Sequence, residues 1–218
     1  MAFVLLFSIV FHEFAHSLTA ILFGGQVRDI TLQLLGGCAA ITRMPPKPWQ
    51  ECVMALAGPL ASFLLTAVFG WLSYALASEQ PNYAAGIIYV EPNLWFGMAA
   101  MINFGLGCFN LIPAFPMDGG RVLRSLLETF GQRKVRATET AVRVGRVIAS
   151  VWGITWLLDL LFGWTLPCPT GAPFFIAYFW SLLFGGGGFL LPLIAYMVWV
   201  SGQRELDYVR AETAYYGV

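Results

Sequence analysis

The sequence predicts an all-α, multi-pass membrane protein with about five to six transmembrane helices and one small β-hairpin. Of its 218 residues, 58% are hydrophobic and only 11% are charged, and the mean hydropathy is +0.71. Soluble domains carry about 25% charged residues, so this composition excludes an ordinary soluble fold. The apolar residues also gather in runs of about 20, the length that a helix needs to cross the hydrocarbon of a bilayer.

Four apolar stretches are typical of membrane spans, and they cover residues 2–23, 53–77, 94–112 and about 144–163. The first span begins directly after Met1, with no basic segment before it, so we expect no cleavable signal peptide. Residues 174–200 are also apolar, but a run of four glycines at 185–188 interrupts them. This pattern predicts a broken helix, or a short interfacial helix followed by one span. A flexible loop is the alternative for the glycine run.

Lysine and arginine residues lie in alternate loops of this predicted topology. They occur between spans one and two, between spans three and four, and after the last span, whereas the loops near 78–93 and 164–173 contain none. The positive-inside rule therefore places the basic loops and the C-terminus in the cytoplasm. We expect a multi-pass, integral protein of a prokaryotic cell membrane. For the basic loops, orientation alone and additional binding of lipid or a partner are the two alternatives.

The two histidines of the chain, His12 and His16, stand four residues apart in the first span, and Glu13 follows the first of them. On a helix these histidines share one face, so both imidazoles can bind one Zn²⁺ while the glutamate takes a proton from water. A pair of buried, hydrogen-bonded histidines is the alternative. A charged glutamate in apolar surroundings is costly unless it is used, which favours the metal site.

A zinc ion with one open position needs a third protein ligand. No histidine remains, and the cysteines lack the spacing of a metal site, so a carboxylate is expected. The strongest candidate is Asp118, just after the third span. Pro113 and Pro116 break the helix before it, and Gly119 and Gly120 allow close backbone approach after it. Capping of the following helix is the alternative role for Asp118.

Three motifs in successive spans strengthen this interpretation, namely His12-Glu13-x-x-His16, Ala57-Gly58-Pro59-Leu60 and Asn110-x-x-Pro113-x-x-Pro116-x-Asp118-Gly119. Together they resemble the site-2 protease family of intramembrane zinc metalloproteases, over residues 2 to about 130. The resemblance implies one Zn²⁺ per chain, with His12, His16 and Asp118 as ligands and Glu13 as the general base. It also implies that Asn110 holds the scissile peptide or its oxyanion, with a plain interhelical hydrogen bond as the alternative.

Other segments complete the predicted architecture. Residues 27–35 and 38–43 flank two glycines and predict a short β-hairpin. In the family a corresponding sheet lies near the active site, where an unwound substrate segment can pair with its edge; a membrane-surface loop is the alternative. Gly58-Pro59 predicts close packing and a kink, and Ser62, where relatives often carry asparagine, is given no catalytic role. Only eleven residues precede His12, whereas family members commonly carry another span there.

The residues and the resemblance together predict one membrane-embedded peptidase domain, 1–218, with a catalytic core at 2–130 and C-terminal helices at 140–210. Its function would be zinc-dependent hydrolysis of a peptide bond in or near a transmembrane segment of a membrane-tethered protein, as in regulated intramembrane proteolysis. Its partners would be a single-pass or membrane-anchored substrate, the lipid bilayer and a regulatory membrane protein. The net charge of zero indicates no nucleic acid. Two alternatives remain, a catalytically silent scaffold of the same fold and a metal transporter.

Overall fold

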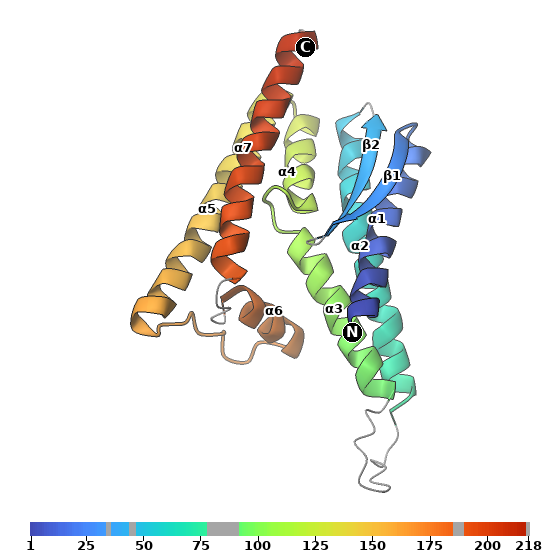
Figure 1. Ribbon diagram of the computed structural model, residues 1–218, viewed down its shortest axis with the longest axis vertical. Coiled ribbons are helices and arrows are strands. Elements are labelled where there is room, and N and C mark those ends of the chain that lie inside the picture. Colours follow the sequence, from blue (N-terminus) through green and yellow to red (C-terminus); the bar gives the residue numbers. More distant parts are fainter. Residues whose placement is uncertain (34–35, 44–46, 78–91, 185–189, 217–218) are drawn as a thin grey trace, which may run out of the picture.

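The computed structural model describes residues 1–33, 36–43, 47–77, 92–184 and 190–216. Within these residues the chain forms seven helices and one two-stranded hairpin (Figure 1). The elements in chain order are α1 (Ala2–Leu22), β1 (Gln26–Gln33), β2 (Gly36–Arg43), α2 (Pro48–Ala75), α3 (Pro92–Asn110), α4 (Asp118–Thr129), α5 (Lys134–Phe162), α6 (Phe174–Phe184) and α7 (Leu190–Tyr216).

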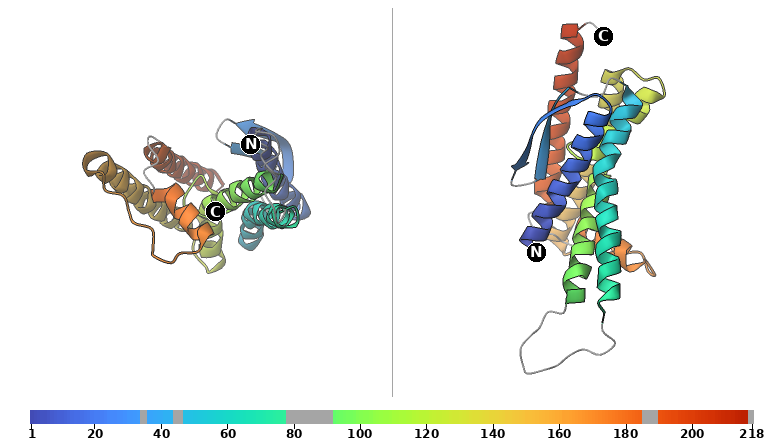
Figure 2. Two further views of the ribbon diagram at one scale, coloured as in Figure 1. Left: turned by 90° about the horizontal axis from the view of Figure 1, so that it is seen from below. Right: turned by 90° about the vertical axis from the view of Figure 1, so that its right-hand side faces the viewer.

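The helices are arranged in two groups joined by α4. In the first group α2 packs against both α1 and α3, and in the second α5 and α7 run along each other. α4 lies between the groups and contacts α2 on one side and α5 on the other (Figures 1 and 2). This arrangement brings the start of α4 toward the N-terminal helices, although about a hundred residues separate them in sequence.

Three of the described helices, α1, α2 and α5, are long and apolar enough to cross a membrane. They match the predicted spans at 2–23, 53–77 and about 144–163. Their outward faces expose large apolar side chains, including Leu22, Trp71 and Phe162 at 74%, 65% and 74% exposure. Soluble monomers rarely leave such extensive apolar surface uncovered. The chain is therefore an integral membrane protein.

The expected five to six spans exceed the three that length and composition support in the described residues. α3, which we predicted as a span at 94–112, has 19 residues and includes Asn93, Asn103 and Asn110. Asn103 is fully buried, and its amide donates a hydrogen bond to the carbonyl of Ala99. α3 packs along α2, and small and polar residues are typical of such helix–helix interfaces.

The C-terminal region forms a short helix followed by a longer one; that the first is interfacial and the second a span stays a prediction. α6 has 11 residues, which is too short to cross a bilayer. α7 has 27 residues, but it is apolar only as far as Val200 and carries many charges beyond that point. The glycine run at 185–188 lies outside the described residues, so the choice between a broken helix and a loop stays a prediction.

The predicted hairpin is present, with slightly different bounds. β1 and β2 pair antiparallel, with Ile30 opposite Ala39 and Gln33 opposite Gly36. Residues 34 and 35, which we assigned to the first strand, lie outside the described residues. The two glycines that we expected between the strands, Gly36 and Gly37, belong to β2. The hairpin contacts α1 and lies on the same side of the molecule as that helix (Figure 1).

A buried arginine holds α4 against helices of both groups. The guanidinium of Arg124 donates hydrogen bonds to Glu51 of α2 and Glu205 of α7, and it lies 5.4 Å from the ring centre of Phe115. Burial lowers the pKa of Arg124, but the two carboxylates outweigh burial and raise the pKa above its usual value. A buried ion pair adds little net stability, yet loss of one partner would leave an uncompensated charge. The contact therefore specifies how α2, α4 and α7 fit together.

Candidate metal centre

His12 and His16 lie one helical turn apart on the buried face of α1. Their exposed fractions are 4% and 7%, and their Nε2 atoms are 3.2 Å apart. The i and i+4 positions of a helix share a face, so both rings point toward the same place between α1 and α2. The predicted face-sharing of the two histidines is therefore present in the structure.

Asp118, the first residue of α4, completes the cluster from 106 residues away. Its Oδ2 atom lies 3.0 Å from Nε2 of His12 and 3.1 Å from Nε2 of His16. The approach depends on the glycine that follows, because a Cβ atom on Gly119 would lie 2.3 Å from the carbonyl oxygen of Leu111. The close backbone approach predicted for this glycine is confirmed.

The segment before Asp118 is held by packing as well as by its prolines. Ala114 and Met117 are buried in a cluster with Trp152 of α5 and Val198 of α7. The ring of Phe115 is buried in a second cluster, which includes residues of the same two helices. The C-terminal helices thus support the segment that positions the Asp118 carboxylate.

The outer ring nitrogens of both histidines also have partners. Nδ1 of His16 lies 2.7 Å from the carbonyl oxygen of Met54, and Nδ1 of His12 lies 2.9 Å from Oγ of Ser62. Because a carbonyl oxygen only accepts, Nδ1 of His16 carries the hydrogen, and in the neutral ring Nε2 then presents a lone pair. That lone pair faces a carboxylate oxygen of Asp118, which is an acceptor too. A cation between them would satisfy both groups.

The three inward-facing atoms fit one zinc ion. Two histidine nitrogens and one carboxylate oxygen are a donor set typical of catalytic zinc sites. Tetrahedral ligands at about 2.0–2.1 Å from the metal are separated by about 3.3 Å, close to the 3.0–3.2 Å found among these atoms. A backbone carbonyl behind a histidine, as for His16, is the usual way in which a protein orients such a ligand.

α2 forms one wall of the site, through residues that are spaced four apart. Met54, Gly58 and Ser62 share one face of this helix, and all three are buried. A Cβ atom on Gly58 would lie 2.2 Å from Nε2 of His16 and 2.5 Å from Nε2 of His12. The predicted close packing at Gly58 is confirmed, and its physical cause is contact between the α2 backbone and both imidazoles.

Ser62 has a role at the site that the sequence did not reveal. We gave this position no catalytic function, and the structure shows that it supports His12 through the 2.9 Å contact with Nδ1. The signal that could have revealed it is its four-residue spacing from Gly58, which belongs to one of the three motifs. Met54 gave no signal, because its contribution is a backbone carbonyl.

The two residues predicted to act in catalysis, Glu13 and Asn110, are not part of the cluster of three ligand atoms. Glu13 is half-buried on α1, next to His12. Asn110 is the last residue of α3, and its amide nitrogen donates to the carbonyl of Leu106 at 3.0 Å. This bond lies within one helix, unlike the interhelical bond considered as an alternative. The catalytic roles of both residues stay predictions.

Known proteins that resemble this chain include zinc metalloproteases, as the donor set of the site would suggest. The model of peptidase family M50 matches residues 1–152. A protein of Synechocystis sp. named as a candidate zinc metalloprotease is 33% identical over 187 residues, which are 84% of this chain and 43% of that protein. A zinc metalloprotease of Methanocaldococcus jannaschii is 36% identical over 163 residues, which are 74% of this chain and 42% of the relative. The matched region thus spans less than half of each relative.

A solved structure shows a similar fold. The site-2 protease from Methanocaldococcus jannaschii superposes with a TM-score of 0.60 at 28% sequence identity, covering 94% of this chain and 76% of that one. The family match includes all three residues of the candidate metal site, which lie within residues 1–152. The chain therefore belongs to peptidase family M50, the zinc metalloproteases of the site-2 protease type.

Proposed function

We propose that this chain is the membrane-embedded peptidase domain of an intramembrane zinc endopeptidase. The observation that carries the proposal is the meeting of His12, His16 and Asp118, buried between α1, α2 and α4 in a membrane protein. In this proposal residues 1–218 form one domain, with a catalytic core at 2–130 and supporting helices at 140–210. Packing of α5 and α7 around the segment before Asp118 supports one domain in which the C-terminal helices stabilise the catalytic core.

The chemistry we propose follows from these side chains. His12, His16 and Asp118 hold one zinc ion, which when bound polarises the scissile carbonyl and lowers the pKa of a water molecule. Glu13 takes the proton of the attacking water and delivers it to the leaving amine. Ser62 and the Met54 carbonyl keep the two imidazoles in orientation. Asn110 would turn from the Leu106 carbonyl to hold the scissile peptide or its oxyanion.

The substrate class follows from the membrane setting. An intact helix hides its carbonyl carbons, so the substrate would be a transmembrane segment of a membrane-tethered protein that unwinds locally. The hairpin of β1 and β2, which contacts α1, could accept such a segment at its edge. We propose regulated intramembrane proteolysis as the biological role, with a further membrane protein controlling access.

Two other functions are less well supported. A transporter should present metal ligands at successive depths across the bilayer. The ligand atoms of His12, His16 and Asp118 instead all lie within 4.8 Å of one another. A silent scaffold of the same fold would not need Glu13 beside a complete ligand set. Purified protein that binds no zinc under any condition would favour the scaffold.

Replacement of Asp118 by alanine tests the proposed ligand set. Two imidazoles alone hold Zn²⁺ far more weakly than three ligands, because the preorganised chelate is lost. We expect bound zinc to fall from one per chain to near zero, with loss of cleavage of a membrane-anchored reporter. Asp118→His, which supplies a nitrogen ligand, should recover part of the metal. Metal analysis by mass spectrometry measures both.

Asp159→Ala serves as the matched control for this test. Asp159 lies in the last turn of α5, next to the helix end at Phe162 and remote from α1 in the fold. Its removal should leave zinc content and cleavage unchanged. If Asp118→Ala protein keeps one zinc per chain with normal affinity, the third ligand is another residue and the proposed assembly is wrong.

We also propose that the basic loops and the C-terminus face the cytoplasm of a prokaryotic cell. A native residue tests this orientation, since Cys168 is exposed in the loop at 164–173. In a Cys38→Ser background, a membrane-impermeant maleimide should label Cys168 in intact cells. Cys52 and Cys108 should react little, because Cys52 is buried and Cys108 is half-buried. Cys168→Ser should abolish the label. Labelling of Cys168 only after the cells are opened would contradict the proposed orientation.

A further inference from the structure

The level of the membrane boundary can be located on α5 and α7. α5 carries charged residues up to Arg146 and none from there to Asp159 in its last turn, whereas α7 is apolar up to Val200 and charged beyond it. The two transitions lie side by side, because Arg146 donates a 2.5 Å hydrogen bond to Gln203 and its guanidinium lies 5.0 Å from the ring centre of Trp199. Arginine and tryptophan together are typical of the interface between hydrocarbon and lipid headgroups.

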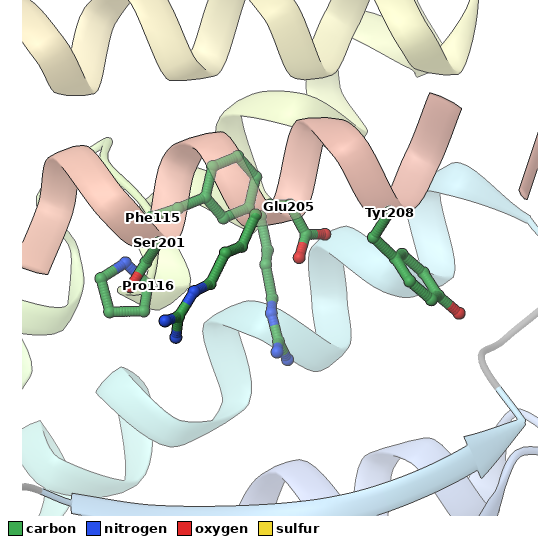
Figure 3. Close-up of a pocket in the computed structure, with 7 residues that line it drawn as sticks. Phe115, Pro116, Ser201, Glu205 and Tyr208 are labelled. Atoms are coloured by element: carbon green, nitrogen blue, oxygen red, sulfur yellow. The ribbon is translucent and has the colours of Figure 1, made fainter. Parts of the chain in front are cut away.

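A pocket opens at this same level on another face of α7. Its volume is about 290 Å³, and it is lined by Phe115, Pro116 and Arg121 on one side and by Ser201, Arg204, Glu205 and Tyr208 on the other. The α7 residues follow a helical spacing of three and four, so they share one face. Figure 3 shows Glu205 and Tyr208 projecting from the same side of α7.

The charges of the pocket favour an anion. Among the described residues, neither Arg121 nor Arg204 takes part in an ion pair. The Glu205 carboxylate, in contrast, accepts a hydrogen bond from the guanidinium of Arg124. Two guanidiniums therefore remain to face the pocket. Ser201 and Tyr208 add hydroxyl donors. Planar guanidiniums beside hydroxyl groups match the oxygens of a phosphate.

We propose that this pocket binds the phosphate of an anionic phospholipid headgroup. The occupant follows from position and chemistry, because the donors lie at the headgroup level of the bilayer, where phosphate esters are concentrated. Basic pockets at the edge of transmembrane helices are suited to such headgroups. Pro116, which is exposed beside the buried Phe115, offers apolar surface to the part of the lipid next to the phosphate. This inference does not depend on the proposed peptidase function.

Native mass spectrometry of the full chain in mild detergent tests the proposal with defined lipids. We expect one phosphatidylglycerol to be retained per chain, at least about tenfold more tightly than phosphatidylcholine. Each lost hydrogen bond to a charged group weakens binding by about tenfold or more. R121Q/R204Q should therefore lose the retained phosphatidylglycerol. R204Q alone changes one exposed side chain of α7 and leaves the packing of the helices intact, and it should show a smaller loss.

A matched variant and four competing ligands test whether the pocket itself holds the lipid. R136Q/R143Q removes two exposed arginines of α5 and the same total charge, and it should leave lipid retention unchanged. Equal loss in that control, or unchanged retention in R121Q/R204Q, would overturn the proposal. Equally tight binding of glycerol 3-phosphate or inorganic phosphate would mean a soluble phosphate site instead. Displacement of the lipid by an acidic peptide, but not by a second anionic lipid, would assign the pocket to a protein ligand.

Discussion

Replacement of Glu13 by glutamine is expected to abolish cleavage of a membrane-anchored reporter while bound zinc stays at one per chain. Glutamine preserves the size of the side chain but cannot take the proton of the attacking water. Loss of a positioned general base lowers the rate by about 10²–10⁴ or more. Glu13 lies beside His12 and is not one of the three convergent ligands, so metal binding should persist.

Glu139→Gln is a matched control for this variant. It removes the same charge from an α5 residue that pairs with Arg210 at the surface. Its cleavage rate should equal that of the unmodified protein. Metal analysis and reporter cleavage on the same purified samples separate the two roles. Full activity of Glu13→Gln would refute the proposed mechanism, and loss of zinc would move Glu13 from proton transfer to metal binding.

Replacement of Gly58 by alanine is expected to weaken metal binding strongly, although the change adds a single methyl group. That methyl would lie 2.2 Å from Nε2 of His16 and 2.5 Å from Nε2 of His12. These two atoms are the proposed zinc ligands, and α2 cannot retreat without moving the Met54 carbonyl and Ser62 as well. We expect zinc affinity to fall by about 10- to 100-fold or more, with a matching loss of cleavage.

Gly70→Ala provides the control on the same helix. A Cβ atom at Gly70 would meet no atom within 4 Å, so only the general effect of alanine on the helix remains. Zinc affinity in that variant should be unchanged. Competition against a chelator of known affinity measures both variants. Normal zinc binding in Gly58→Ala would show that the metal lies away from this wall of the site.

The apolar runs of the sequence were enough to locate α1, α2 and α5, because a lipid-facing helix must be apolar over the length that crosses the hydrocarbon. They were less informative for α3 and α7. α3 carries Asn103 in a buried position and packs along α2, and the second half of α7 is charged. For such helices composition reflects neighbouring protein as much as lipid, so the number of spans could not be read from hydropathy alone.

By itself, the sequence determined the membrane setting, the shared face of His12 and His16, and Asp118 as the expected third ligand. These conclusions depend on local periodicity and on the small number of available ligands, which short segments of chain already contain. Only the tertiary structure decided how the site is built. The contacts of Ser62, Met54 and Gly58 with the histidines depend on how α2 packs against α1. Such contacts involve a hydroxyl, a backbone carbonyl and a glycine without a side chain. Their importance becomes visible only once the packing of α1 against α2 is known.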